Sequence, residues 1–451
     1  MPNFDKLAKS YEQGAVKALQ DFIRINSVYD EMTIGEGAPY GLGVKKALEY
    51  FAKLGSNFGW KSKVINGYCT EITVGNEGPL VGIYGHSDVV PVSGKWTHKP
   101  FGAEIKDGVI YGRGACDDKG PLLASLWAVK LLQDEGLLKG FRVKIVSGGD
   151  EELGSSCLNY YFNEYKGEAP KFGFTPDANW PLIYAEKGIT RYDASYEGEL
   201  GPVIAMNGGV VRNAVCDYVL VTLKPDAKFV KYLKDKAIKC EITDNSALLM
   251  VRFSGKTAHA STPELGENAM VSCFEALGDF YKLEVLSKAA KAMKDCHGKS
   301  FGGYNMSKEL GEATYNYGIV NYDGKNLNFT IDFRFGEEAR PEELIAKFGE
   351  ATRLELTKKS ESKMLIYDKK STLVSTLMKA YKKGAHKLFA KPLAIGGGTY
   401  AKEAPNTVAF GAEWPKHPGN MHSPDEYIYI EDFIKDIAIY ARAIYALGTA
   451  K

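Results

Sequence analysis

The chain has 451 residues, which exceeds the length at which one hydrophobic core keeps growing, so the sequence predicts two domains. Apolar residues make up 45% and charged residues 25% of the chain, and the formal net charge is +1. This near-neutral charge gives no electrostatic reason to expect nucleic acid as a partner. The lysine-rich stretches at 228–239 and 358–370 are interleaved with acidic or apolar residues and indicate solvated helix faces.

Cysteine usage and the lack of long apolar runs indicate where the protein works. Seven cysteines are scattered along the chain without a Cys-x-x-Cys pair, so neither a disulfide framework nor a zinc knuckle is predicted. The first residues, MPNFDKLAKSYEQ, contain no apolar signal core, and no run of about 18 apolar residues occurs. We therefore expect a cytoplasmic protein with no membrane partner.

Helical and strand-like patterns alternate up to residue 187. Helices are predicted at 15–25, 44–54 and 122–132, and strands at 80–84, 142–146 and 172–174. Gly55 is expected to end the second helix, and Pro121 to open the third. This order predicts an α/β domain with a doubly wound, mostly parallel sheet, which binds ligands at the carboxyl ends of its strands.

From residue 188 the pattern changes to alternating apolar and polar residues, which predicts half-buried antiparallel strands. Strands are expected at 191–197, 217–223, 247–253 and 327–335, and helices at 228–237, 266–283 and 341–356. We interpret 188–371 as an α+β domain inserted into the first domain, which is discontinuous and consists of 1–187 and 372–451. The last segment is expected to complete the first sheet and to bring His422 back to its edge.

Histidine and carboxylate residues follow several predicted strands. His86 and Asp88 lie in the segment VGIYGHSDVVP and share one face of an extended chain, because residues two apart do so. One ring nitrogen of His86 can bind a metal while Asp88 holds its other N–H or a neighbouring group. Taken alone, the pair also fits a surface turn.

Two acidic pairs are more specific. Asp117 lies in YGRGACDDKG, where glycines allow a close approach of the backbone, although Asp117 and Asp118 could also cap the next helix. Glu151 and Glu152 follow a predicted strand, and adjacent carboxylates cannot easily bind one ion. One can therefore bind a metal while the other takes a proton from water; the alternative is an acidic helix N-terminus.

Two more candidates complete a possible metal site. Asp177 follows Thr-Pro after a predicted strand, and His422 lies in MHSPDE near the C-terminus. Two imidazoles and three carboxylates suffice for two divalent metals if one carboxylate bridges them. In this order and at strand ends, the five residues are difficult to explain as caps and turns: His86, Asp117, Glu152, Asp177 and His422.

This series of motifs resembles the M20 family of di-zinc peptidases, and most closely its PepV-like bacterial dipeptidases, over essentially the whole chain. The resemblance implies that Asp117 bridges two metal ions. His86 and Asp177 would complete the ligands of one ion, and Glu152 and His422 would complete those of the other. It also implies that Glu151 is the general base, that Asp88 orients His86, and that the Asp117–Asp118 peptide bond is cis.

The resemblance extends to the inserted domain at 188–371, and it implies that this domain is a lid for a catalytic domain formed by 1–187 and 372–451. His259, in GKTAHASTP, corresponds to the histidine that stabilises the oxyanion. Asn213 and Arg334 resemble the lid residues that hold the backbone and the carboxylate of the substrate. The segment GGGTY at 396–400 resembles a loop that also meets this carboxylate, which gives the substrate contacts Gly397, Gly398 and Thr399.

The resemblance thus implies a dipeptidase that hydrolyses the amide bond of short peptides by attack of a metal-bridging water. Two divalent ions per chain are expected, most readily zinc, although manganese and cobalt also suit nitrogen and oxygen ligands. Long lids accompany monomers in the family, so a monomer acting on a small peptide is expected. An N-acyl amino acid amidase or deacylase of the same family is the alternative, and a non-catalytic metal-binding relative is less favoured. A serine hydrolase is unsupported, because no Gly-x-Ser-x-Gly segment occurs.

Overall fold

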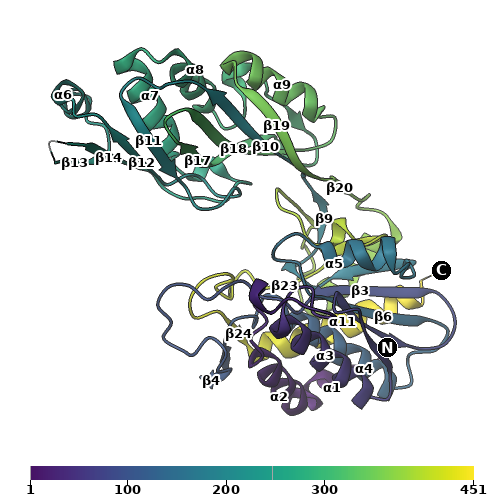
Figure 1. The fold of residues 1–451 in the computed structure, drawn as a ribbon. Coiled ribbons are helices and arrows are strands. Elements are labelled where there is room, and N and C mark those ends of the chain that lie inside the picture. The colour runs from purple at the N-terminus through teal and green to yellow at the C-terminus, as the bar shows by residue number, and fades with distance from the viewer. Residues whose placement is uncertain (1, 246, 451) are drawn as a thin grey trace. The chain divides into compact units, whose positions relative to one another are not determined.

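The structure is a computed structural model that describes residues 2–245 and 247–450 (Figure 1). Met1 and Lys451, the outer ends of the predicted catalytic domain, lie outside the described residues, as does Ser246. The chain divides into two compact units. Unit 1 consists of Met1–Tyr184, Ile366–Leu393 and Gly398–Lys451, and unit 2 of Ala185–Leu365 and Ala394–Gly397.

A mixed sheet carries the strands that end near the predicted site (Figure 1). Its order is β1-β2-β6-β3-β7-β22-β9-β20, and β21 pairs with β9. The strands are β1 Lys61–Ile65, β2 Cys69–Val74, β3 Leu80–His86, β6 Arg142–Gly148, β7 Phe172–Thr175, β9 Ile183–Glu186, β20 Leu365–Ile366, β21 Leu393–Ile395 and β22 Thr407–Ala409. The middle strands β6, β3, β7 and β22 are parallel, whereas β1, β2 and β9 pair antiparallel. A mostly parallel sheet is therefore correct only for the middle, because a tight hairpin joins β1 to β2.

The helices of unit 1 follow the apolar periodicity. They are α1 Phe4–Ser10, α2 Glu12–Ile23, α3 Leu42–Asn57, α4 Lys119–Asp134, α5 Ser156–Asn159, α10 Thr372–Gly384 and α11 Ile430–Gly448. Helix α4 is buried over most of its length and packs against α11 and β3. Gly55 does not end α3, as predicted, but lies inside it. An added Cβ there would lie 2.8 Å from Ile72 Cδ1, so the glycine allows close packing of helix and sheet.

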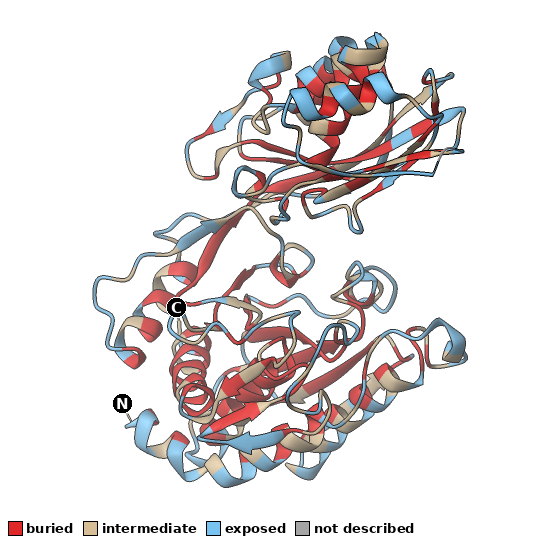
Figure 2. Cartoon of the chain, turned by 90° about the vertical axis from the view of Figure 1, so that its left-hand side faces the viewer, coloured by how far each residue is buried: buried red, intermediate tan, exposed pale blue. Residues whose placement is uncertain are grey.

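Unit 2 contains an antiparallel sheet of order β13-β14-β12-β11-β17-β18-β10-β19. Its strands are β10 Gly188–Glu197, β11 Val203–Gly208, β12 Tyr218–Leu223, β13 Cys240–Asp244, β14 Leu249–Ser254, β17 Thr314–Tyr322, β18 Asn326–Phe335 and β19 Glu355–Ser362. The helices are α6 Ala227–Asp235, α7 Ala269–Tyr281, α8 Glu284–Met293 and α9 Pro341–Thr352. Buried residues concentrate between helices and sheet (Figure 2). The predicted alternation is confirmed in β12, where Val219, Val221 and Leu223 are buried.

Two predictions in unit 2 are wrong for one reason. The helix expected at 341–356 ends at Thr352, because Arg353 adopts a left-handed conformation with φ 61°. Strand β19 then begins at Glu355, so the lysine-rich stretch at 358–370 starts on an exposed edge strand and not on a helix. Lysines on an edge strand discourage pairing with another chain.

The remaining global features concern cysteines and membranes. All seven cysteines are unpaired, which confirms the predicted absence of a disulfide framework. Among the helices in residues 2–245 and 247–450, none combines the length and apolar character needed to cross a membrane.

Candidate metal centre

Three predicted ligand segments meet because three neighbouring strands are parallel. His86 is the last residue of β3, and β7 ends two residues before Asp177. Strand β6 ends at Gly148, shortly before Glu151 and Glu152. Since β6, β3 and β7 are adjacent and parallel, their carboxyl ends lie at one edge of the sheet.

Asp117 and His422 reach this edge from loops. Asp117 lies between β5 Val109–Tyr111 and α4, and its peptide bond to Asp118 is cis, as expected. His422 precedes β24 Tyr427–Tyr429, which pairs with β5. This pairing brings the two loops side by side. His422 has φ 59°, a costly conformation for a residue with a side chain and one that concentrates at functional sites.

The carboxylate of Asp117 lies between two imidazoles. Its Oδ1 is 2.9 Å from Nε2 of His86, and its Oδ2 is 2.9 Å from Nε2 of His422. Nε2 of His86 also lies 3.8 Å from Oδ2 of Asp177, and Nε2 of His422 lies 3.2 Å from Oε2 of Glu152. All five predicted metal ligands are therefore brought together in unit 1.

Glu151 lies in the same cluster. Potential ligand atoms of His86, Glu151 and Asp177 lie within 4.8 Å of one another, and so do those of His86, Asp117 and Glu152. Both glutamates are thus close enough to bind an ion. The division of roles between Glu151 and Glu152 stays a prediction.

Asp88 supports this cluster through backbone contacts. Its two carboxylate oxygens accept hydrogen bonds from the N–H groups of Glu151 and Glu152, at 3.2 and 3.1 Å. Nδ1 of His86 lies 2.9 Å from the main-chain oxygen of Asp88 and 3.4 Å from its Oδ1. Asp88 therefore contacts the His86 ring mainly through its carbonyl, while its side chain fixes the glutamate turn.

The cluster holds more negative charge than its imidazoles can balance. Burial, with the charge of Asp117 as a second cause, raises the pKa of Asp177 to about 7. Burial also raises the pKa of Glu151, beside Asp177, and of Glu152, beside Asp117. Hydrogen bonds to Asp117 and Glu152 raise the pKa of His422 to about 10. Buried carboxylates with imidazole nitrogens suit a divalent cation, so the donor set fits a metal site.

Residues predicted to contact the substrate are divided between the units. His259, Asn213, Arg334 and Gly397 belong to unit 2, and Gly398 and Thr399 to unit 1. The main-chain oxygen of Asn213 accepts a hydrogen bond from the N–H of Ala260, which places Asn213 beside the His259 loop.

The side chains of His259 and Arg334 are each held by neighbours within unit 2. Nδ1 of His259 lies 2.7 Å from Oγ of Ser261. Arg334 is buried and donates from Nε to Asp332 and from Nη1 to the main-chain oxygen of Gly396. The guanidinium group thus has a fixed orientation beside the predicted glycine loop.

Glu426 is a buried carboxylate near the site for which the sequence predicts no role. Glu426 Oε2 accepts a hydrogen bond from Arg113 at 2.5 Å. Its Oε1 lies 3.0, 3.1 and 3.3 Å from the main-chain nitrogens of Gly114, Cys116 and Asp117, which donate to it. The motif MHSPDE contains Glu426, but no sequence signal indicates that it is buried against a loop more than 300 positions earlier.

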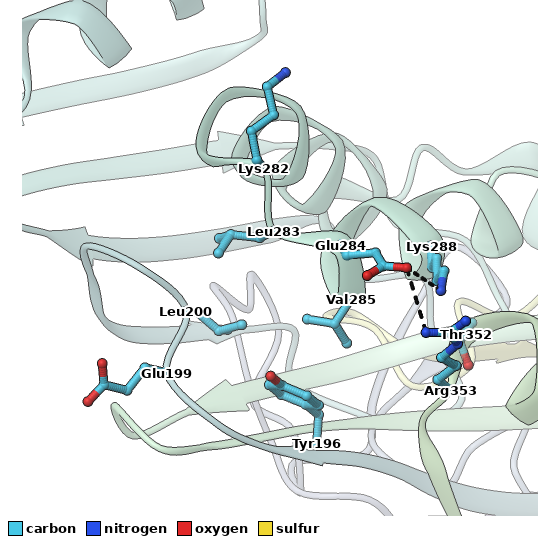
Figure 3. Close-up of a pocket in the computed structure, with 10 residues that line it drawn as sticks. All are labelled: Tyr196, Glu199, Leu200, Lys282, Leu283, Glu284, Val285, Lys288, Thr352 and Arg353. Atoms are coloured by element: carbon cyan, nitrogen blue, oxygen red, sulfur yellow. Dashed lines mark ion pairs between the residues drawn. The ribbon is translucent and has the colours of Figure 1, made fainter.

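A pocket of about 290 Å³ lies elsewhere, in unit 2 (Figure 3). Leu200 and Leu283 contribute to its apolar wall, and Glu284 pairs with Lys288 and Arg353 at its rim. None of the predicted site residues lines this pocket. The negative charge of Glu284 at the rim is balanced by Lys288 and Arg353, so we assign no chemistry to this pocket.

Comparison with known proteins agrees with this geometry. The model of Peptidase family M20/M25/M40 matches residues 82–446. The chain is 34% identical over 461 residues to "Putative dipeptidase YtjP" of Bacillus subtilis (strain 168), with 97% of this chain and 98% of that protein covered. It is 31% identical over 471 residues to "Putative dipeptidase" of Staphylococcus epidermidis (strain ATCC 12228 / FDA PCI 1200), with 97% of each covered.

Solved structures share the fold. The M20 family metallo-carboxypeptidase Sso-CP2 from Sulfolobus solfataricus gives a TM-score of 0.60 at 18% identity, with 97% of this chain and 99% of that chain covered. Human carnosine dipeptidase 1 gives a TM-score of 0.59 at 13% identity, with 100% of each chain covered.

Proposed function

The chain belongs to peptidase family M20/M25/M40 and hydrolyses peptide bonds, and we propose that it is a metal-dependent dipeptidase. The observation that carries this proposal is the position of Asp117. Its two carboxylate oxygens each lie 2.9 Å from a different imidazole, as a bridging ligand requires. The name of the Bacillus subtilis relative supports short peptides as the substrate class. The proposal includes a monomeric chain with a small peptide as its partner.

In the proposed site, Asp117 serves two metal ions. His86 and Asp177 complete one set of ligands, and Glu152 and His422 complete the other. Divalent ions held by these residues, zinc first and manganese or cobalt as alternatives, would supply the positive charge that polarises the scissile carbonyl and lowers the pKa of water.

Glu151 is the proposed general base. Its carboxylate accepts a proton from the attacking water and then delivers it to the nitrogen of the leaving amine, so that the proton is conserved through hydrolysis. The hydrogen bond from its N–H to Asp88 supports this role, because it holds the turn on which Glu151 lies.

Unit 2 is the proposed lid, which supplies recognition of the substrate. His259 stabilises the oxyanion that forms when the carbonyl is attacked. Asn213, Gly397, Gly398 and Thr399 hold the peptide backbone. Arg334 binds the C-terminal carboxylate, which its planar fork of donors suits better than a lysine would.

Removal of the bridging carboxylate tests the metal arrangement. Asp117→Ala is expected to lower the metal content of purified protein from about two ions per chain to nearly none, because both ions lose a ligand. Elemental analysis after dialysis measures this. Glu168→Gln, a change at an exposed carboxylate paired with Arg142, is the control and should leave the content unchanged. Retention of one full equivalent in Asp117→Ala would contradict a bridge.

The role of Glu151 can be separated from that of Glu152. Glu151→Gln is expected to keep the wild-type metal content and to lower kcat by about 10²–10⁴, because it removes a base and not a ligand. Glu152→Gln should instead lose metal. If the metal loss follows Glu151→Gln, the two roles are reversed.

His259 can be tested without disturbing the metal centre. His259→Ala is expected to lower kcat by about 10²–10³, with the metal content unchanged, because its contact with substrate strengthens in the transition state. Steady-state kinetics on one dipeptide measure this effect. Ser261→Ala, which removes only the neighbour of Nδ1, should have a smaller effect. A fully active His259→Ala would remove the oxyanion role.

A substrate panel decides between dipeptidase and amidase. We expect the wild-type enzyme to cleave a dipeptide faster than its C-terminal amide or an N-acyl amino acid. Arg334→Lys should reduce cleavage of the dipeptide far more than that of the amide. The dipeptide has a C-terminal carboxylate that pairs with the guanidinium group, and the amide has none. Comparison of kcat/KM across the panel measures both effects, and thermal unfolding checks that the variant is folded. Faster cleavage of N-acyl amino acids by the wild type would favour the amidase.

A further inference from the structure

Glu426 occupies an unusual position in the segment that carries His422. It lies four residues after His422, is fully buried, and forms its contacts with the loop that carries Asp117. The loop residues from 112 to 118 are in neither a helix nor a strand, so their N–H groups lack the partners that regular structure provides. Glu426 supplies an acceptor for several of them.

The contacts have the form of a built anion nest. One carboxylate oxygen, Oε1, accepts N–H groups from Gly114, Cys116 and Asp117, while the other, Oε2, accepts from Arg113. Convergent main-chain N–H groups favour an anion at their focus. Here the anion is a side chain of the protein, and one of its donors is the N–H of the proposed bridging ligand itself.

We infer that Glu426 is a positioning residue that fixes Asp117 between His86 and His422. The inference rests on the proposed function, because it gives a purpose to the placement of Asp117 as a metal ligand. Glu426 itself contacts neither metal nor substrate in this role, because it acts through the backbone of the Asp117 loop.

The contacts of Glu426 connect it to the metal centre through the loop of Asp117. A buried ion pair such as Arg113–Glu426 commonly adds little stability over an apolar pair of similar size, but removal of one partner alone is costly, so the folding of each variant is checked together with its zinc affinity. Strand pairing also fixes the register of both loops, since Tyr427 lies opposite Tyr111. Glu426 and His422 therefore lie on one segment that is held against the loop of Asp117, and the Glu426 carboxylate contacts that loop directly.

Zinc affinity of the metal-free protein tests the inference. Glu426→Gln keeps the size of the side chain and removes its charge. Its NH₂ group, which can only donate, would then face either Arg113 or the loop N–H groups, which also donate. We expect at least a tenfold rise in the zinc dissociation constant, measured by competition with a chromophoric chelator. In the loaded enzyme kcat should fall more than KM rises, because Asp117 is misplaced while peptide contacts are intact.

The same segment offers a matched control. Asp425 accepts the N–H groups of Thr97 and His98, both at 2.9 Å, and so holds a different loop by the same kind of contact. Asp425→Asn is expected to bind zinc within threefold of the wild type. Equal loss of affinity in Asp425→Asn and Glu426→Gln would overturn the inference, because any damage to the segment would then suffice.

A second variant covers the case in which Glu426→Gln does not fold. Glu426→Asp keeps the charge but is one methylene shorter, so it cannot reach Arg113 and all three N–H groups together, and we expect a smaller loss of zinc affinity. If neither variant folds, the carboxylate serves the fold and the inference is wrong. Wild-type zinc affinity in a folded Glu426→Gln would also overturn it, whereas a wild-type protein without zinc affinity would refute the proposed function instead.

Discussion

The concentration of buried negative charge at one edge of a sheet is the constraint on which the rest of unit 1 depends. Four carboxylates face two imidazoles there, and isolated buried charge is too costly to persist without a compensating cation. The parallel middle strands deliver three ligand segments to this edge. Helix α4 begins at Lys119, directly after the Asp117–Asp118 pair, so these two carboxylates belong to the residues at its N-terminal end, where negative charge is favoured.

Carboxylates that are not proposed ligands hold the backbone of those that are. Asp88 binds the N–H groups of Glu151 and Glu152, and Asp118 Oδ2 accepts the N–H of His86 at 3.1 Å. Glu426 serves the Asp117 loop in the same way. The backbone of three proposed ligands, His86, Asp117 and Glu152, is thus held by side chain to main chain contacts, which leave their own side chains available for a metal ion.

Four of the five proposed ligands follow a local signal, either an apolar strand, as His86 does, or a glycine-rich turn, as Asp117 does. His422 follows neither and is predicted only from the order of the motifs. Predicted element ends were wrong where packing or backbone conformation decides them. Gly55 lies inside α3, and a glycine is needed there because an added Cβ would lie 2.8 Å from Ile72 Cδ1. Arg353 stops α9 through its own backbone conformation. Glu426 could not be assigned, because its partner Arg113 lies 313 positions away and neither residue belongs to a periodic pattern.

Within unit 2 the proposed recognition residue Arg334 is held by its neighbours, as the proposed ligands of unit 1 are. Arg334 donates hydrogen bonds to Asp332 and to the main-chain oxygen of Gly396. The main-chain oxygen of Ile395, one residue before Gly396, accepts a hydrogen bond from the N–H of Lys187. These contacts explain why the short segment Ala394–Gly397 belongs to unit 2 although the chain has already returned to unit 1. A fold of this kind accommodates many substrates, so selectivity depends on such side chains and not on the architecture. Under the proposed function, changes around Arg334 would therefore alter which peptide ends are accepted, while the proposed chemistry at Asp117 would stay the same.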